Sequence, residues 1–513
     1  MIALLFWIPV LAGLLAFLIR SDRLRRGLLV ATAIGNSLVV GAAWIHRPHA
    51  IWSGWLALDD VGLLFLTITS VVFLAAAVYA VGYLAAEGHP DSRRDFKEGV
   101  LFSNGPESIF TGGLLLFLAT MTVMSMSQNF GIFWVALEAS TLASAPLIYF
   151  HRHHRSLEAS WKYLMLCSVG IAVALLGNFC LALAASAHGH GISLEVAPLL
   201  AHAAALDPRW LKAAFLFLLV GYGTKMGLAP LHTWLPDAHA ESPSLVSALL
   251  SGALLNCAFL GILRIYQVCA AAGLGSFSQG LLTGFGLLSM AVATIYILNQ
   301  SDYKRMLAYS SVEHMGLLAL GVGLGGAGVF GALLHALNHS LAKAMLFLVA
   351  GNILSLYQTR TSALVKGILR RAPSVGIFWL VGLFAITGFP PFGTFLSEFT
   401  ILKRAFDLKD FAIGTAILVS LGLVFVGFAT SILAMAQGPT DPGDPTARSP
   451  ELSGERAPVS AAAPTAILGS PSISWFTVMP PAVLGVVLLA LGLYLPAGLD
   501  HLLHAAAASL GGS

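Results

Sequence analysis

Three titratable residues recur at helical spacing in the apolar stretch GALLHALNHSLAKAMLFLVAGN. His335, His339 and Lys343 are each four residues apart, so they share one face of a predicted helix. Histidine gains and loses a proton near neutral pH, and such a row of groups favours proton transfer along the helix. Hydrogen-bonded packing and a metal site are the alternatives, although no nearby set of carboxylates supports a metal.

A lysine occurs in a second apolar stretch, at the start of GTKMGLAPLHTWLPD. Lys225 is followed by Gly227 and Pro230, which interrupt helical hydrogen bonding. A charge near the middle of a membrane costs about 2.5–3.5 kcal/mol on insertion scales. A broken helix is tolerated there only where it faces protein or a water-filled cavity. Lys225 is therefore a candidate proton-carrying residue beside a discontinuous helix.

Two acids lie in comparable apolar surroundings. Glu138 lies near the middle of NFGIFWVALEASTLASAPLIYF, and an isolated buried carboxyl group must be either protonated or paired. With Lys225 it would form a proton switch or, alternatively, a static ion pair. Glu398 follows a second break in LFAITGFPPFGTFLSEFTIL. One broken helix in each half of the chain is typical of transporters built from paired repeats.

Other polar residues could form a proton entrance. His232, Asp237, His239 and Glu241 follow the first break, in a predicted loop without basic residues, where loop capping is an equally good interpretation. Lys162 is expected at the cytoplasmic mouth of a helix, where its long side chain can reach water.

The elements that must position these residues are membrane helices. Of the 513 residues, 57% are hydrophobic and only 10% are charged, with a mean hydropathy of +0.84, whereas soluble domains contain about 25% charged residues. Apolar runs long enough to span a bilayer recur along the chain and predict an all-α polytopic membrane protein with about fourteen helices. The expected spans are 2–19, 27–45, 61–86, 109–127, 129–150, 161–186, 210–228, 243–270, 278–299, 306–324, 328–356, 373–397, 411–436 and 477–495.

The distribution of basic residues predicts the orientation. Most of the loop lysines and arginines fall in alternate loops, beginning with the one after the first span. The positive-inside rule places those loops in the cytoplasm and both termini outside. Residues 437–476 are rich in proline, alanine, serine and glycine and predict a flexible cytoplasmic linker before the last helix.

The sequence predicts no cofactor or metal in this chain. Cys167, Cys180, Cys257 and Cys269 all lie in apolar spans without the spacing of an iron–sulfur or zinc site. No glycine-rich nucleotide-binding loop is present either. Any redox chemistry linked to this protein is expected in another chain.

Several motifs resemble those of a known family. WLPDAHAESPSLVSALLSG, SDYKRMLAYSSVEHMG, HALNHSLAKAMLFLVAGN and GFPPFGTFLSEFTIL are similar to motifs in the antiporter-like proton-translocating subunits of respiratory complex I, Mrp antiporters and energy-converting [NiFe] hydrogenases. SLEASWKYLMLCSVGIAVALLGN and SSVEHMG most resemble component F of hydrogenase-4. The resemblance covers roughly residues 60–435.

The resemblance implies a specific architecture. The family has fourteen helices with two inverted five-helix repeats, each containing one discontinuous helix. Applied to this chain, it implies N-terminal helices in 1–110, repeats in 111–270 and 271–436, and a C-terminal helix and tail in 477–513.

The resemblance also implies roles for the buried residues. Glu138 and Lys225 match the acid–lysine pair of the first half-channel, while Glu398 matches the residue after the second break. His335, His339 and Lys343 fall on the helix of the second half-channel.

The chain departs from the family pattern between the two halves. Family members commonly carry histidine or lysine in the helix after the first break, whereas SALLSGALLNCAF offers Ser251 and Asn256. Either water held by these two side chains bridges the halves, or the central pathway is rerouted or impaired.

The expected function is proton translocation by a non-catalytic membrane subunit of a redox-driven respiratory or hydrogenase complex in a bacterial cytoplasmic membrane. Its expected partners are other membrane subunits and soluble [NiFe], iron–sulfur or NADH-dehydrogenase-type subunits, with no nucleic acid. The alternatives are an Mrp-like cation/proton antiporter module, which could carry sodium, and a membrane scaffold or ion module coupled to a soluble enzyme.

Overall fold

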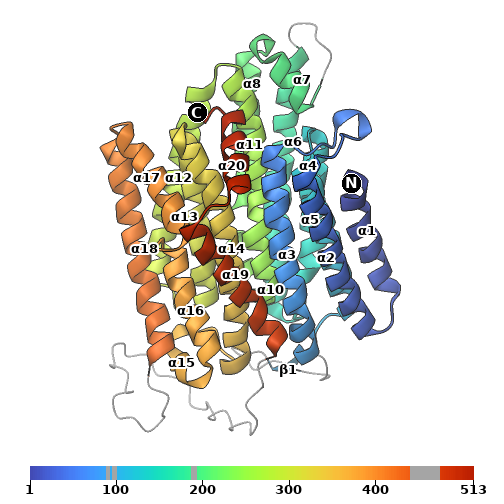
Figure 1. Ribbon diagram of the computed structural model, residues 1–513, viewed down its shortest axis with the longest axis vertical. Coiled ribbons are helices and arrows are strands. Elements are labelled where there is room, and N and C mark those ends of the chain that lie inside the picture. Colours follow the sequence, from blue (N-terminus) through green and yellow to red (C-terminus); the bar gives the residue numbers. More distant parts are fainter. Residues whose placement is uncertain (88–92, 95–100, 187–192, 439–473, 513) are drawn as a thin grey trace.

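Helices form nearly all the regular structure of the protein (Figure 1). The computed structural model describes residues 1–87, 93–94, 101–186, 193–438 and 474–512. Eleven of the described helices are long and apolar enough to cross a membrane, and α1 and α16 are apolar but shorter. Each expected span contains a helix, so the all-α polytopic fold is confirmed.

The helices of the first part of the chain run close to the expected bounds. They are α1 (Ile2–Leu18), α2 (Asp22–Ile45), α3 (Asp60–Glu87), α4 (Glu107–Met126), α5 (Phe130–Ile148), α6 (His154–Ser186), α7 (Val196–Ala201), α8 (Pro208–Met226), α9 (Trp234–Glu241), α10 (Ser244–Leu249) and α11 (Leu255–Ala271). A π-helical turn (Leu250–Leu254) joins α10 to α11, and the short strands β1 (Arg93–Arg94) and β2 (Leu101–Phe102) pair before α4.

The second part of the chain continues in the same way. Its helices are α12 (Gly275–Leu298), α13 (Tyr303–Leu324), α14 (Ala327–Tyr357), α15 (Ile368–Arg371), α16 (Pro373–Ile386), α17 (Gly393–Asp407), α18 (Phe411–Gln437), α19 (Trp475–Leu493) and α20 (Ala497–Ser509). Short 3₁₀ turns lie at Trp52–Gly54, Ala203–Ala205 and Ser362–Leu364. Most of the expected linker, 437–476, lies outside the described residues.

The first break separates α8 from α9. α8 begins where the Asp207 carboxylate accepts from the backbone amides of Arg209 and Trp210, and it ends at Gly227, whose φ of 85° suits glycine. The freed backbone groups find side-chain partners: Trp234 donates from its indole nitrogen to Thr224 O at 2.8 Å, and Ser289 Oγ accepts from Ala229 N at 2.9 Å. The interruption is therefore enclosed by protein, as the membrane requires.

The second break separates α16 from α17. It includes Gly388, whose φ is 62°, and Thr394 donates from its hydroxyl to the free carbonyl of Ala385. A Cβ at Gly388 would overlap the carboxyl group of Glu398. Glycine at this position therefore allows the acid to pack directly against the broken backbone.

The two halves have the same order of membrane-spanning units. One set is α4, α5, α6, α8–α9 and α10–α11, and the other is α12, α13, α14, α16–α17 and α18, with the fourth unit broken in each. Because an odd number of crossings brings the chain to the opposite side, the second set starts there and is inverted relative to the first. The residue boundaries of the repeats stay a prediction.

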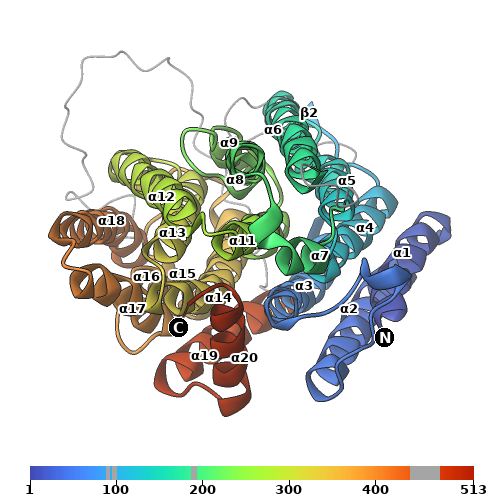
Figure 2. The ribbon, with the colours of Figure 1, turned by 90° about the horizontal axis from the view of Figure 1, so that it is seen from above.

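The two sets lie side by side when the molecule is viewed from above (Figure 2). α12, α13 and α16–α18 gather on one side and α4–α6 on the other, with α3, α11 and α14 between them. α19 packs against α14 and α3. Both termini lie at the same end of the bundle, opposite β1 and α15 (Figure 1). The expected tail contains a helix, α20, whose Ser509 O accepts from Gln267 Nε2 at 2.8 Å.

Small residues allow α6 and α8 to approach closely. A Cβ at Gly221 of α8 would lie 2.6 Å from both Ala174 Cβ and Gly170 O of α6. Such contacts are common between membrane helices, where packing replaces the hydrophobic effect.

We expect Gly221→Leu to lower the free energy of unfolding by about 1–3 kcal/mol, since the added side chain forces the two helices apart. Gly41→Leu is the matched control, because a Cβ there has nothing within 4 Å. Thermal unfolding in detergent, followed by size-exclusion chromatography, measures both. Equal stability of the two variants would contradict this account of the α6–α8 contact.

Candidate functional site

Lys225 lies fully buried in the last turn of α8. Its ammonium group donates to Thr141 Oγ1 of α5 and to the Tyr163 hydroxyl of α6, both at 2.7 Å. It also lies 4.5 Å from the centre of the Tyr163 ring, a cation–π distance. Neutral hydroxyl groups and an aromatic face thus hold the lysine.

Glu138 lies one helical turn before Thr141 on α5. Its Oε1 accepts from Ser168 Oγ at 2.9 Å, while its Oε2 is buried without a hydrogen-bond partner. Glu138 interacts electrostatically with Lys225, but the two do not form a direct ion pair. The static ion pair considered as an alternative is therefore absent from these described residues.

Histidines of two helices meet in the second half. His335 of α14 lies between His314 of α13 and Ser397 of α17: His314 Nδ1 is 2.9 Å from His335 Nε2, and His335 Nδ1 is 2.9 Å from Ser397 Oγ. The ring centres of His339 and His314 lie 5.0 Å apart, and neither ring nitrogen of His339 has a partner. The titratable residues expected on one face of α14 therefore also contact a histidine of α13, His314.

One ring nitrogen from each of His314, His335 and His339 lies within 4.8 Å of the other two, close enough to consider a shared metal ion. However, His335 uses both ring nitrogens in hydrogen bonds to His314 and Ser397. This arrangement fits a chain for proton transfer without any metal. The expectation that this chain binds no metal stays a prediction.

Charged residues flank the histidines. Lys343 Nζ donates to Leu307 O of α13 at 2.8 Å. Glu398 has a buried carboxyl group whose Oε1 lacks a partner. Glu313 of α13 is fully buried, and neither of its carboxyl oxygens has a hydrogen-bond partner. It interacts electrostatically with both Lys343 and Glu398. Glu313 and His314 were visible in SSVEHMG as polar residues in the middle of a membrane helix, but neither was predicted as a site residue.

The centre contains both predicted polar residues and one further histidine. Ser251 and Ser311 hydroxyls lie 2.8 Å apart, and Asn256 Nδ2 donates to Ser340 Oγ at 2.6 Å. Ser251 lies in the π-helical turn, a distortion that is frequent at functional sites. His239 of α9 stacks on Phe347 of α14 at 4.9 Å. His239 is buried with both ring nitrogens unpaired, so a titratable group does lie between the halves.

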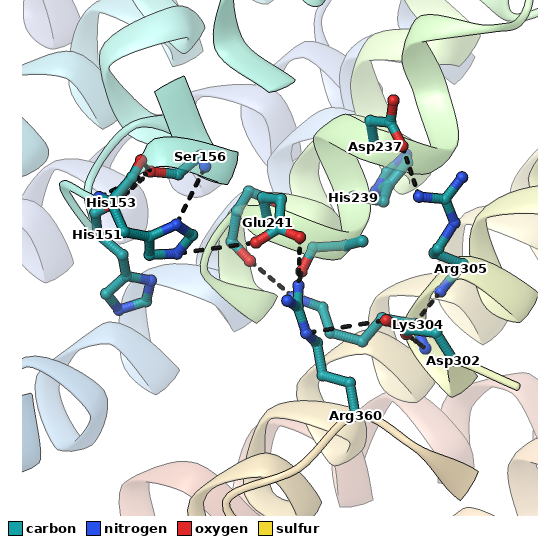
Figure 3. Close-up of polar contacts among 12 residues, drawn as sticks. His151, His153, Ser156, Asp237, His239, Glu241, Asp302, Lys304, Arg305 and Arg360 are labelled. Carbon is teal, nitrogen blue, oxygen red and sulfur yellow. Dashed lines mark hydrogen bonds and ion pairs between the residues drawn. The ribbon is translucent and has the colours of Figure 1, made fainter. Parts of the chain in front are cut away.

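The segment after the first break is a helix, α9, and not a loop. The segment has no lysine or arginine of its own, but folding brings basic residues to it: Asp237 pairs with Arg305 of α13 at 2.5 Å (Figure 3). Asp237 also pairs with Lys162 of α6 at 3.0 Å. His232 is buried, with its ring centre 6.3 Å from that of Tyr309. Lys162 is half exposed, as expected for a helix mouth.

Glu241, the last residue of α9, forms the second part of this network. Arg360 pairs with Glu241 at 3.0 Å and approaches Asp302 at 3.8 Å (Figure 3). His153 Nε2 lies 3.7 Å from Glu241, and Lys304 donates to Ser242 O at 2.6 Å. Although burial opposes the charge, Glu241 and Asp302 hold the pKa of Arg360 above its ordinary value. The network therefore fixes α9 to α13 and to the segment after α14.

Comparisons with known proteins agree with this geometry. Residues 127–424, more than half of the chain, match the family described as "NADH:quinone oxidoreductase/Mrp antiporter, TM". The chain belongs to this family. The "Hydrogenase-4 component F homolog" of Methylacidiphilum infernorum (isolate V4) is 37% identical over 396 residues, which cover 75% of this chain and 80% of that relative.

More distant members of the family show the same likeness. "NADH-quinone oxidoreductase subunit N" of Desulforudis audaxviator (strain MP104C) is 29% identical over 411 residues, covering 78% of this chain and 76% of that protein. A chain of the Mrp complex from Dietzia sp. DQ12-45-1b has the same fold, with a TM-score of 0.82, 23% identity and coverage of 99% of this chain and 96% of that chain. The resemblance read from the sequence motifs is thus confirmed, while the roles of individual site residues stay predictions.

We expect Arg360→Ala to destabilise the protein by about 3–5 kcal/mol, because it leaves the largely buried Glu241 without its cation. Lys403→Ala, which breaks the exposed Lys403–Asp407 pair at 2.7 Å, should cost only about 0–1 kcal/mol. Thermal unfolding in detergent gives both values. Adding Glu241→Gln to Arg360→Ala should restore part of the loss, and no recovery would contradict the uncompensated charge as its cause.

Proposed function

We propose that this protein is a proton-translocating membrane subunit of a redox-driven complex of the hydrogenase or NADH:quinone oxidoreductase type. The observation that carries the proposal is the presence of buried titratable groups, several of them hydrogen-bonded to one another or to hydroxyl groups, beside or between two broken membrane helices. Lys225 adjoins the first break, Glu398 adjoins the second, and the histidines of α13 and α14 lie between Lys343 and Ser397. Buried ionisable groups of this kind mark ion pathways in membrane proteins.

The surroundings of Lys225 suit a group that changes its charge. Thr141 and Tyr163 accept hydrogen bonds from its ammonium group but carry no formal negative charge. Burial disfavours the charged form of the lysine, and the balance between charged and neutral lysine then depends on more distant groups, including the ionisation of Glu138. When Glu138 is ionised, Lys225 is favoured as a cation, and when Glu138 takes up a proton, Lys225 releases one.

Bound water and a titratable side chain are both candidates to carry protons between the two halves. Ser251 and Asn256 can hold water, since Asn256 Oδ1 has no partner. His239 offers a titratable ring on α9, opposite Phe347 of α14. The path we propose runs from Glu138 and Lys225 past this centre to Lys343, the histidines and Glu398.

The assembly follows from the relatives. Of the two relatives described above, the hydrogenase-4 component F homolog has the higher sequence identity to this chain. By this likeness, the chain assembles with other membrane subunits and with soluble [NiFe] or iron–sulfur subunits. By the positive-inside rule, the ion network of α9, α13 and Arg360 faces the cytoplasm of a bacterial cell and both termini face outward. The chain itself binds no cofactor.

Two other functions make different predictions. An Mrp-like cation/proton antiporter module is the second candidate, on the basis of the fold shared with the Mrp complex, and its transport would require a counter-cation such as sodium. A membrane module coupled to a soluble enzyme would retain that enzyme instead. Purification of the tagged chain from its native membrane distinguishes the three functions by the proteins that purify with it. [NiFe] and iron–sulfur or quinone-enzyme subunits support the redox-driven complex. Other antiporter subunits support the Mrp-like module, and an enzyme without redox centres supports the enzyme-coupled module.

We expect Lys225→Ala to abolish redox-driven proton uptake in inverted membrane vesicles while the complex still assembles, because the variant removes the fully buried lysine that ends α8 at the first break. Lys212→Ala is the control: this lysine lies on the same helix but is exposed, 5.5 Å from the Phe277 ring centre, and uptake should be unchanged. Fluorescence quenching of a pH-sensitive dye measures the rates. Undiminished uptake with Lys225→Ala in an assembled complex would refute the proposed role.

A further inference from the structure

Glu313 is the buried acid to which neither the sequence motifs nor the proposed path assigns a role. It lies in the middle of α13, its side chain is fully buried, and both carboxyl oxygens lack hydrogen-bond partners. Burying a polar group without a partner is costly, and each such group in a native structure needs an explanation. An acid in this setting is stable when it holds a proton or when a charged neighbour compensates it.

The position of Glu313 within the inverted repeats matches that of Glu138. α5 and α13 are each the second unit of their five-unit set, and each carries one acid near its midpoint. The lysines are not matched in this way, since Lys225 lies on the broken fourth unit and Lys343 on the unbroken third. Each half thus contains an acid on its second unit and a lysine on a neighbouring unit.

Hydrogen bonds around the histidines fit one arrangement of the ring protons, which starts from the hydroxyl group of Ser397. Ser397 Oγ donates to Thr394 O at 2.8 Å, so its oxygen accepts from His335 Nδ1–H. His335 Nε2 must then accept from His314 Nδ1–H. The remaining nitrogen, His314 Nε2, is left with a lone pair. It lies 3.5 Å from Glu313 Oε2.

In this arrangement the lone pair has no hydrogen-bond partner and lies next to an acid that can donate a proton to it. An ionised Glu313 would place negative charge against it, whereas a protonated Glu313 would supply the missing hydrogen. We propose that Glu313 is the proton-carrying acid of the second half, which loads the His314–His335–Ser397 chain toward Glu398. The inference rests on the proposed function, because it adds a carrier to that path.

The transfer balances without any further reactant. The O–H bond of Glu313 breaks and an N–H bond forms at His314 Nε2. The proton on His314 Nδ1 moves to His335 Nε2, and the proton on His335 Nδ1 moves to Ser397 Oγ, which passes its own proton on toward Glu398. Glu313 is left as a carboxylate and both imidazoles are neutral again, each with its proton on the other nitrogen.

The charges around Glu313 support a shared proton. Lys343 and Glu398 are the charged groups with which it interacts electrostatically. Two ionised carboxylates beside one lysine would leave a net negative charge inside the protein, which desolvation makes expensive. One acid therefore holds a proton while Lys343 is charged, and the histidine chain lets that proton move from Glu313 to Glu398.

We expect Glu313→Gln to slow redox-driven proton uptake by about a hundredfold, the typical worth of a positioned proton-transfer group, in native vesicles with the complex assembled. Glu313→Asp keeps the acid but widens its approach to His314, so its rate should lie between those of wild type and Glu313→Gln. Asp407→Asn is the matched control, because Asp407 is an exposed acid on α17 paired with Lys403, and its uptake should equal wild type.

Infrared difference spectra of the complex provide a readout that packing alone would not change. Wild type should show the carbonyl band of a protonated carboxyl group that Glu313→Gln lacks. Normal uptake by Glu313→Gln, while Lys225→Ala is inactive, would overturn this inference and leave the proposed function intact. Normal uptake by Lys225→Ala would instead overturn the proposed function. If Glu313→Gln does not assemble, the Asp variant decides, and a wild-type rate with it would overturn the inference.

Discussion

The carbonyl and amide groups freed where α8 and α16 end inside the membrane need partners, because hydrocarbon offers none. Protein supplies them: Trp234 and Ser289 at the first break, and Thr394 at the second. The same enclosure that satisfies the backbone also surrounds the charged groups next to it. Lys225 and Glu398 can therefore be buried at these points, whereas on a lipid-facing helix surface they could not.

The two halves bury different sets of titratable groups beside their broken helices. In the first half, Lys225 donates hydrogen bonds to two hydroxyl groups, and the acid Glu138 does not contact it directly. In the second, one lysine is accompanied by Glu313, Glu398 and the histidines of α13 and α14. The second half therefore has more titratable groups than charges it can stabilise at once. A region of that composition holds protons that can be redistributed without importing counter-ions, which is the property a proton path needs.

The sequence was informative where polarity contrasts with apolar surroundings. Lys225, Glu138, Glu398 and the row from His335 to Lys343 stand out for that reason, and the glycines and prolines beside them predicted both breaks. Partners distant in sequence could not be predicted in the same way. Asp237 and Glu241 were expected in a loop that has no basic residues of its own. Their cations, Lys162, Arg305 and Arg360, come from other segments and meet them only through folding.

Glu313 shows a different limit. Its polarity was as visible as that of Glu138, but no break, proline or second charge at helical spacing accompanied it. Its significance depends on its approach to His314 and on the contacts of that histidine with His335 of α14 and, through His335, with Ser397 of α17. Hydrogen-bond polarity through three helices is a property of the folded chain, so spacing along one helix cannot reveal it.

α13 connects the buried chain with the ion network at the end of the bundle. Its first residues follow Asp302, whose carboxylate accepts from the Lys304 and Arg305 backbone amides and lies near Arg360. Arg305 pairs with Asp237 of α9, and about two turns later the same helix carries Glu313 and His314. Because α9 follows the break beside Lys225, the pairing of Asp237 with Arg305 ties the segment after the first break directly to the helix that carries Glu313 and His314.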